Sequence, residues 1–200
     1  MSSDWVMEAV TIIVPVKDEE VGLQYLLENF NQSDIKERYI VNFIFVIDYR
    51  TSDTSKNQAL KFSSNIIDQK LTSGKGSAIR QAVENWKKKP TKFTIFLDAD
   101  GSYSFEGVCE ILVELEKGSD VVSGSRMSPN VRTKKGMSRL HAIGNMVLSK
   151  ISSIRNGRKI SDLCTGLWGF EREALMKLNF KSKGFDLEAE IVGLIRKRNL

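Results

Sequence analysis

Two aspartates one residue apart, at the end of an apolar run, are the residues best placed to do chemistry. The run from Phe93 to Leu97 leads directly into Asp98-Ala99-Asp100. Side chains at positions i and i+2 of an extended backbone point to the same side, so both carboxylates can face one point. They repel each other there unless a cation or a proton lies between them. Mg2+ and Mn2+ prefer oxygen ligands and are often shared with substrate phosphates, so the pair is a candidate metal site.

Two other readings of the same aspartates need comparison. Asp100 could begin a turn and cap the helix expected to start near Phe105. An EF-hand loop is excluded, because its sixth position would be Tyr103, where the loop needs Gly, and its twelfth would be Cys109, where it needs Glu. The capping and metal-binding interpretations both remain open on these residues alone.

Composition indicates a single soluble domain. The 200 residues are 41% hydrophobic and 28% charged, which is enough to bury a sizeable core. No apolar run approaches the length of a membrane span, and the N-terminus lacks the features of a signal peptide. Two cysteines, Cys109 and Cys164, are too few for a disulfide framework and favour a reduced, cytoplasmic setting. The single histidine, His141, has no marked partner, which argues against a Cys–His hydrolase.

Positive charge is concentrated in one part of the chain. The net charge is only +5, yet no acidic residue occurs between Val121 and Ser161. The cations of this stretch are Arg126, Arg132, Lys134, Lys135, Arg139, Lys150, Arg155, Arg158 and Lys159. Such a block is expected to face a pyrophosphate, a lipid phosphate, a membrane surface or a nucleic acid.

Buried apolar runs alternate with amphipathic segments along the chain. The expected strands are Val10–Val16, Val41–Ile47, Ile66–Ile67, Phe93–Leu97, Asp120–Arg126 and Leu167–Phe170. The runs are rich in β-branched residues, as in strands that are covered on both faces. This order predicts a doubly wound, Rossmann-like α/β domain with a mostly parallel central sheet and helices on both faces.

The helices follow from the 3.6-residue period. Asp18 is expected to cap the first helix. Its expected apolar face is Val21, Leu23, Leu26, Leu27 and Phe30. A second helix would carry Ala59, Leu60 and Phe62, and further helices are expected at Ser77–Trp86, Phe105–Lys117, Ser138–Ile154 and Arg172–Leu178.

The segment Gly74-Lys75-Gly76-Ser77, at the start of one expected helix, suggests a phosphate-binding turn. It is not a Walker loop, because Gly76 rather than Ser or Thr follows Lys75, and Gln69 stands where the first Gly belongs.

Polar residues stand at the carboxyl ends of the expected strands. They are Lys17, Asp18 and Glu19, then Asp48, then Asp98 and Asp100, and finally Arg126. Ligands of open α/β sheets bind outside the carboxyl ends of the strands, so these side chains are expected to converge on one site.

Taken together, these motifs resemble the inverting family-two glycosyltransferases of GT-A fold. The resemblance is greatest to the branch that moves a sugar from a nucleotide onto a polyprenyl (dolichyl) phosphate, and it runs from Thr11 to about Ile195. The segments that carry it are Val14-Pro15-Val16-Lys17-Asp18-Glu19, Val46-Ile47-Asp48 with Asp53, Gly74-Lys75-Gly76, Asp98-Ala99-Asp100, Gly124-Ser125-Arg126, Asp162-Leu163-Cys164-Thr165-Gly166 and Gly184-Phe185-Asp186-Leu187-Glu188.

Roles for individual residues are implied by this resemblance. The donor nucleotide would be bound by Pro15, Lys17, Glu19, Asp48, Lys75 and Asp98. Asp100, with Asp98, would hold Mg2+ or Mn2+, and Arg126 and Arg139 would meet the donor pyrophosphate and the acceptor phosphate. Lys134, Lys135 and Glu188 would lie on the acceptor side. The resemblance further implies one catalytic domain over residues 1–200, truncated at its C-terminus, and a peripheral position on the cytoplasmic face of a membrane.

Two departures from the family pattern leave the nucleobase open between uracil and guanine. The family usually has Asp-Asp-Gly-Ser where this chain has Asp48-Tyr49-Arg50-Thr51, and often Tyr-Asn where Lys17-Asp18 stand.

The acceptor is also open on the residues alone. A phosphate acceptor, with its second pKa near about 6, is mostly ionised at neutral pH and needs little help from a base. A sugar hydroxyl would need a carboxylate base, for which Asp162 is the first candidate and Glu188 the second.

Two other functions were weighed. A sugar nucleotidyltransferase would have a Gly-rich loop after the first strand, where Lys17-Asp18-Glu19-Glu20 stands. A nucleic-acid-binding module could use the basic stretch, but the stretch shows no aromatic stacking motif, and carboxylates would oppose a phosphate backbone. We therefore expect no nucleic-acid partner.

Overall fold

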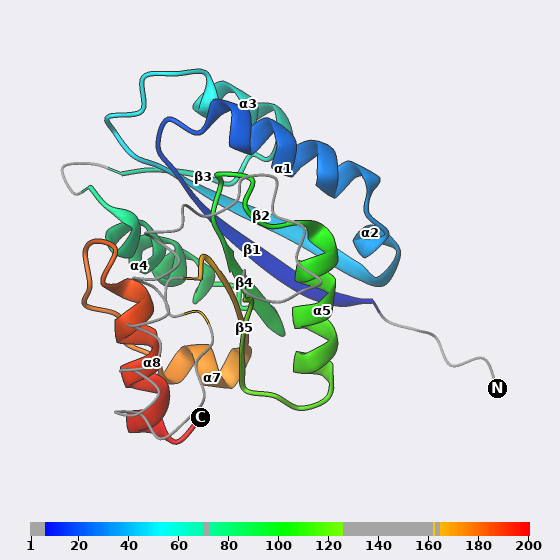
Figure 1. The fold of residues 1–200 in the computed structure, drawn as a ribbon, viewed down its shortest axis with the longest axis vertical. Helices are drawn as coiled ribbons and strands as arrows, with labels where there is room; N and C mark the ends of the chain where they lie inside the picture. Colours follow the sequence, from blue (N-terminus) through cyan, green and yellow to red (C-terminus); the bar gives the residue numbers. More distant parts are fainter. Residues whose placement is uncertain (1–6, 70–72, 126–161, 163–164) are drawn as a thin grey trace.

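The computed structural model describes residues 7–69, 73–125, 162 and 165–200 (Figure 1). A six-stranded sheet, ordered β3-β2-β1-β4-β6-β5, forms the centre of this part of the chain. Its strands are β1 (Glu8–Val16), β2 (Tyr39–Ile47), β3 (Ile66–Asp68), β4 (Phe93–Leu97), β5 (Val121–Ser123) and β6 (Leu167–Glu171). The predicted helix Ser138–Ile154, His141 and Cys164 lie outside the described residues.

The sheet is parallel through its centre and antiparallel at one side. β1 pairs in parallel with both β2 and β4, and β3 joins the far edge of β2 in parallel. β6 runs antiparallel to β4 on one side and to β5 on the other. The prediction of a mostly parallel α/β sheet is confirmed, and the antiparallel direction of β6 is a feature that the strand pattern did not indicate.

Helices cover both faces of the sheet (Figure 1). They are α1 (Glu20–Gln32), α2 (Ile35–Arg38), α3 (Ser55–Phe62), α4 (Lys75–Trp86), α5 (Phe105–Glu116), α7 (Arg172–Lys177) and α8 (Leu187–Arg198). Among the described residues, no helix combines the length and apolar character needed to cross a bilayer.

Alternation along the central strands divides the apolar side chains between two cores. Val10, Ile12 and Val14 of β1 face the core that α1 and α5 cover, whereas Ile13 faces the core under α4 and α8. Successive strand side chains point to opposite faces, so the continuous apolar run of β1 serves both layers at once.

Several local expectations are wrong. Asp18 does not cap α1: it has φ +51°, and its carboxylate instead accepts a hydrogen bond from the Ser52 backbone N–H at 2.7 Å. The N–H at the start of α1, that of Glu20, donates to Asp53 Oδ2 at 3.0 Å. Val21 and Leu60 are 78% and 52% exposed, because each lies beside the buried stripe of its helix and not on it.

Helix α5 starts where it was predicted, but Asp100 does not cap it. The N-cap residue is Ser104, whose hydroxyl accepts a hydrogen bond from the Gly107 N–H. The capping alternative for Asp100 is therefore excluded, and its carboxylate accepts the N–H of Ser102 at 2.9 Å within the loop. Cys109 is partly buried at the edge of the apolar cluster.

Gly169 of β6 allows α5 to pack closely on the sheet. A Cβ at this position would overlap Ile111 Cγ2 and would lie 3.1 Å from Leu115 Cδ1, both on α5. Gly193 on α8 is a useful contrast, since a Cβ there would meet nothing within 4 Å.

We expect the same substitution to have opposite effects at these two glycines. Gly169→Ala should lower the free energy of unfolding by about 1–3 kcal/mol, because the added methyl group overfills the layer between β6 and α5. Gly193→Ala should raise it by about 0.5–1 kcal/mol, because alanine is the better residue in an exposed helix interior. Urea unfolding of both variants measures this, and equal effects would contradict the described packing of α5 on β6.

Candidate functional site

A cavity of about 370 Å3 opens at the carboxyl ends of β1, β2 and β4. Its lining residues are Pro15, Val16, Lys17, Glu19, Asp48, Arg50, Gln69, Gly74, Lys75, Ala78, Asp98, Ala99, Asp100 and Phe185. The order β2-β1-β4 explains the gathering, because parallel neighbours end at the same edge of the sheet.

The structure brings together seven of the residues predicted from sequence to bind donor or metal. They are Pro15, Lys17, Glu19, Asp48, Lys75, Asp98 and Asp100. Of the other predicted site residues, Arg126, Lys134, Lys135 and Arg139 lie outside the described residues. Asp162 is 2% exposed and is not among the residues that line the cavity.

Lys75 joins two carboxylates at the edge of the cavity. Its Nζ lies 2.6 Å from Asp98 Oδ1 and 2.6 Å from Glu188 Oε1, which connects α4 to the end of β4 and to α8. Burial opposes the charged ammonium, but the two carboxylates outweigh it and raise the pKa of Lys75 above its usual value. Burial also raises the pKa of the Asp98 carboxyl, and the Lys75 ammonium opposes that shift.

Close approach at Gly166 also fixes Asp98. The Gly166 carbonyl accepts the backbone N–H of Asp98 at 3.1 Å, and a Cβ on Gly166 would overlap the Asp98 carboxylate. The residue before β6 must therefore be small for Asp98 to keep its present orientation.

Two backbone donors at the start of α4 are already engaged, which disfavours the phosphate-binding turn expected there. The Gly76 N–H donates to the Gly184 carbonyl and the Ser77 N–H to the Lys183 carbonyl, each at 3.2 Å. The helix begins at Lys75, two residues earlier than predicted, and its first turn packs on the loop before α8. Any role of this segment toward a ligand therefore falls to the Lys75 side chain.

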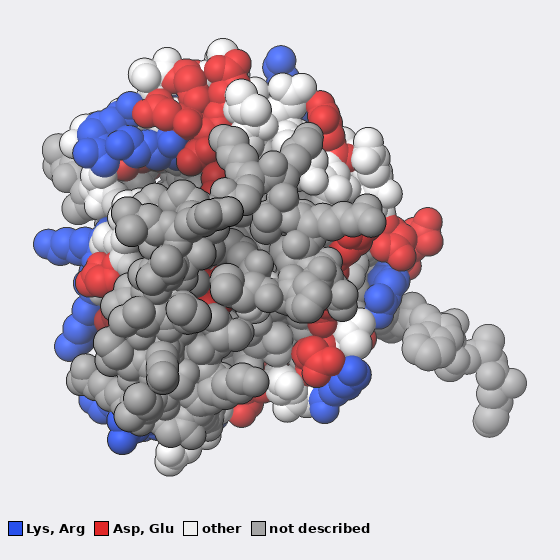
Figure 2. Space-filling view, viewed as in Figure 1, with Lys and Arg blue, Asp and Glu red and all other residues white. Residues whose placement is uncertain are grey.

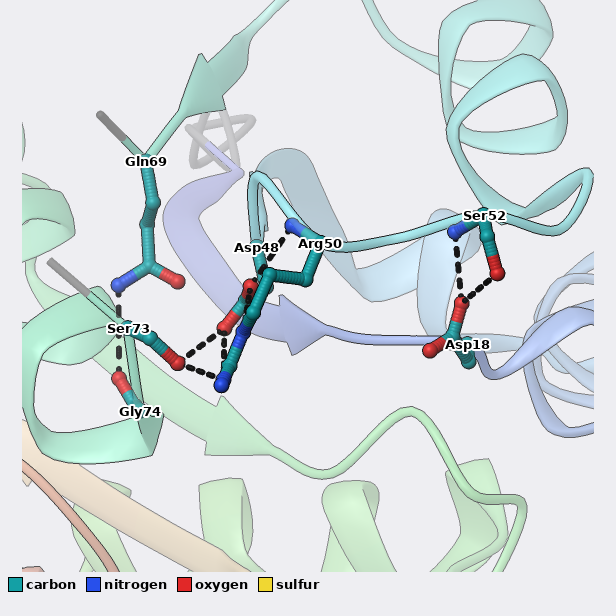
Figure 3. Close-up of polar contacts among 7 residues, drawn as sticks. All are labelled: Asp18, Asp48, Arg50, Ser52, Gln69, Ser73 and Gly74. Atoms are coloured by element: carbon teal, nitrogen blue, oxygen red, sulfur yellow. Dashed lines mark hydrogen bonds and ion pairs between the residues drawn. The ribbon is translucent and has the colours of Figure 1, made fainter. Parts of the chain in front are cut away.

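Asp48 at the end of β2 is held by a dense set of hydrogen bonds (Figure 3). Its Oδ1 accepts from the Arg50 backbone N–H at 2.9 Å and from Arg50 Nε at 3.1 Å. Its Oδ2 accepts from Arg50 Nη2 at 3.1 Å and from the Ser73 hydroxyl at 2.7 Å. Although burial disfavours the charged form, these bonds hold the pKa of Asp48 below its usual value.

The loop after β1 is joined to the loop after β2. Besides the Asp18–Ser52 and Glu20–Asp53 contacts, the Glu19 backbone N–H donates to the Ser55 hydroxyl at 2.9 Å. Because Ser55 is fully buried at the first turn of α3, this bond fixes the backbone of the cavity-lining Glu19.

The donor set of the cavity fits a hard divalent ion shared with a ligand. Among the described residues no three histidine, cysteine or carboxylate side chains gather as ligands of one ion. The cavity instead offers the carboxylates of Asp98 and Asp100. Mg2+ commonly takes one or two carboxylates and completes its shell with waters and substrate phosphates, so two suffice.

Three cavity residues with a polar or aromatic side chain were not predicted as site residues. Arg50 lies in the departure from the family pattern after Asp48, which was a signal that could have marked it. Gln69 is 2% exposed and donates to the Gly74 carbonyl. Phe185 is 89% exposed at the cavity edge, and only its place in the Gly184-Phe185-Asp186 segment could have suggested it.

We expect Lys75→Met to lower the free energy of unfolding by about 2–4 kcal/mol, because it leaves two largely buried carboxylates without their cation. The folded-state pKa of Lys75 is raised, so its stabilisation is fully present below the unfolded value and is lost only as pH rises through the folded value. The destabilisation caused by Lys75→Met should therefore have its full size at neutral pH.

The matched control is Lys87→Met. Lys87 forms an exposed pair with Glu84 on α4, so its loss should change stability by less than about 0.5 kcal/mol. Denaturant unfolding of both variants makes the comparison, and equal losses would show that the Lys75 bridge adds nothing beyond a surface pair.

Comparison with known proteins places the chain in a family. Residues 11–178 match glycosyl transferase family 2. The chain is 28% identical over 193 residues to glycosyltransferase AglJ of Haloferax volcanii, a match that covers 96% of this chain and 60% of that protein. It is 29% identical over 142 residues to a dolichyl-phosphate hexose transferase of the same organism, which covers 71% of this chain and 59% of that protein. The chain thus spans about three fifths of the length of these relatives.

A solved structure shares the fold. Glucosyl-3-phosphoglycerate synthase from Mycobacterium tuberculosis, in complex with Mn2+, UDP and glucosyl-3-phosphoglycerate, matches with a TM-score of 0.71 at 13% identity, covering 96% of this chain and 66% of that one. This likeness confirms the GT-A fold. Since the family match extends over most of the sequence, the chain belongs to glycosyl transferase family 2.

Proposed function

We propose that this chain transfers a hexose from a nucleotide diphosphate sugar to a polyprenyl phosphate, with inversion and with the aid of a divalent metal. The observation that carries the proposal is the cavity itself, in which seven side chains marked by the family motifs meet at the ends of three strands. Membership of a family of sugar transferases supports the reaction class.

The two ends of the cavity suit the two parts of a nucleotide sugar. Asp98 and Asp100 follow β4 and would hold Mg2+ or Mn2+ against the diphosphate. Asp48 follows β2, on the other side of β1, and would lie at the nucleoside end with Pro15, Lys17 and Glu19. When bound, the metal would neutralise charge that develops on the leaving nucleoside diphosphate.

Lys75 would contribute to the same end as the carboxylate pair. Its ammonium lies against Asp98 and is the cation nearest to the predicted metal ligands among the contacts described. A cation in this place favours an anionic ligand and reduces the repulsion between Asp98 and Asp100. We propose that Lys75 also approaches the donor diphosphate.

A phosphate acceptor fits the charges better than a sugar hydroxyl. Glu188, one candidate base for a hydroxyl acceptor, is 7% exposed and already paired with Lys75, so its carboxylate is not open to a hydroxyl group. An ionised phosphate needs no base but needs cations, and the acid-free stretch from Val121 to Ser161 supplies nine. Similarity to a dolichyl-phosphate hexose transferase supports the same choice.

Basic side chains of the described residues add to the positive charge of the protein. Figure 2 shows several Lys and Arg side chains, with a few acidic ones between them, along the flank where α4 and α8 lie, and a group of acidic side chains toward α1 and α3. Because an anionic bilayer attracts a basic flank, we propose that the protein works at the cytoplasmic face of a membrane.

We expect Asp100→Ala to abolish the metal-dependent part of nucleotide binding. With Mn2+ present, nucleotide affinity should fall by about tenfold or more, and EDTA should bring the unaltered protein to the same level. Asp100 is exposed at a strand end, so the melting temperature should change little. Calorimetric titration with and without EDTA is the measurement. A nucleotide affinity that neither Asp100→Ala nor EDTA changes would contradict the metal site.

We expect Arg139→Ala to act on the acceptor. Transfer to a short polyprenyl phosphate should fall by about tenfold or more through loss of a charge-assisted contact, while donor affinity changes by less than about twofold. Arg38→Ala, which removes an exposed pair with Glu116, is the matched control and should transfer normally.

The acceptor assay also tests the proposed class. Radiolabelled transfer from the donor is measured with the lipid phosphate and with free saccharides in parallel. Equal losses of donor binding and transfer would move Arg139 to the donor pyrophosphate. If the sugar is transferred to saccharides and to no phosphate acceptor, the acceptor is a sugar hydroxyl and not a polyprenyl phosphate.

A further inference from the structure

We propose that Arg50 selects the nucleobase of the donor, and that it selects guanine over uracil. The inference rests on the proposed function, because it assumes that the cavity binds a nucleotide sugar. It starts from the observation that Asp48, at the nucleoside end of the cavity, has its carboxylate fully engaged by Arg50 and Ser73 (Figure 3).

The Asp48 carboxylate has no acceptor capacity left for a base. A carboxylate offers about four lone-pair sites, and Asp48 accepts four hydrogen bonds, two at each oxygen. The side chain is 4% exposed, so solvent does not compete for these bonds. If Asp48 accepted a hydrogen bond from an N–H group of a base, it would have to give up one of these four hydrogen bonds.

Arg50 carries the groups that remain for recognition. Its side chain is 46% exposed and lines the cavity, and its guanidinium lies 5.6 Å from the centre of the Tyr49 ring. Nε and Nη2 bind Asp48, and Nη2 also donates to the Ser73 hydroxyl. Among the contacts of the described residues, Nη1 has no acceptor, so its two N–H groups remain for a ligand.

The position of Arg50 matches a base better than a phosphate. The strands β2 and β4 flank β1, so their ends lie about 10 Å apart, a distance that a ribose and a base can bridge. With the diphosphate beside Asp98 and Asp100, the base would reach the end of β2. Arg50 and Asp48 also form a pair of zero net charge, which favours a neutral polar group over an anion.

A donor-only group selects a base by its acceptors. Guanine presents two adjacent acceptors, O6 and N7, and the N–H groups of Nη1 can donate to either of them. Uracil has an N–H between its two carbonyl groups and adenine has an amino group beside N7, so neither presents two adjacent acceptors to Arg50. A base that offers Arg50 fewer acceptors is held by fewer hydrogen bonds and binds more weakly.

Calorimetric titration of GDP and UDP, each with Mn2+, tests the proposal on the unaltered chain and on two variants. The unaltered chain should bind GDP about tenfold or more tightly than UDP. Arg50→Ala should lose most of the preference for GDP and keep its UDP affinity within about threefold, because it removes the N–H groups that read the two guanine acceptors. Arg50→Gln, which presents both a donor and an acceptor, should reduce the preference to less than about threefold.

The loss of preference separates recognition from a structural role. Loss of fold or of cavity shape would lower both affinities together, whereas the proposal requires GDP affinity to fall and UDP affinity to stay nearly unchanged in Arg50→Ala. Arg38→Ala is the matched control and should keep the preference of the unaltered chain. Thermal unfolding of each variant shows whether it is folded, and Arg50→Gln provides the test if Arg50→Ala is not.

The outcomes distinguish this inference from the proposed function. Equal affinities, or tighter binding of UDP, would overturn guanine selection while leaving a nucleotide-binding cavity in place. An unchanged GDP preference in both Arg50 variants would overturn the role of Arg50. Binding of neither nucleotide would overturn the proposed function together with this inference.

Discussion

The ion bridge from Asp98 through Lys75 to Glu188 is the interaction on which the rest of the site depends. It joins the end of a central strand, the first residue of α4 and the first turn of α8, three segments that are distant in sequence. Both carboxylates and the ammonium are largely buried, so each charge would be costly to keep without its partner. The sheet edge can therefore carry several acidic groups because α4 brings one cation between them.

The cavity handles its charges by pairing them in advance. At one end Lys75 offsets Asp98, and at the other Arg50 offsets Asp48, so neither carboxylate faces the cavity as an isolated charge. Asp100 is different, since its carboxylate is exposed and accepts the Ser102 N–H within its own loop. No cationic side chain of the described residues pairs with Asp100, so an incoming cation would meet this carboxylate beside one that Lys75 already offsets.

Much of the fold could be predicted from sequence, because β-branched runs and the helical period report burial directly. The strand-end argument also predicted that five cavity residues converge, since parallel strands end at one edge of the sheet, and the family resemblance added Pro15 and Lys75. The pattern could not show contacts between distant segments. Burial alternates identically in parallel and antiparallel strands, so the direction of β6 was not visible. Likewise, Asp18 has the residue type of a helix cap, but only the tertiary contact with Ser52 decides what its carboxylate binds.

The docking of the loop before α8 onto the start of α4 has a consequence for how this sequence can change. Gly76 lies so close to Ser182 that a Cβ would come within 2.7 Å of the Ser182 carbonyl oxygen, while the Gly184 carbonyl takes the Gly76 N–H. The added Cβ would clash with a backbone atom, so no change of side-chain rotamer could make room for a larger residue at position 76. An insertion or a bulky residue in either segment would have to be matched in the other, about a hundred positions away. Among homologues that keep the bridge, these two segments should therefore covary in length as one unit.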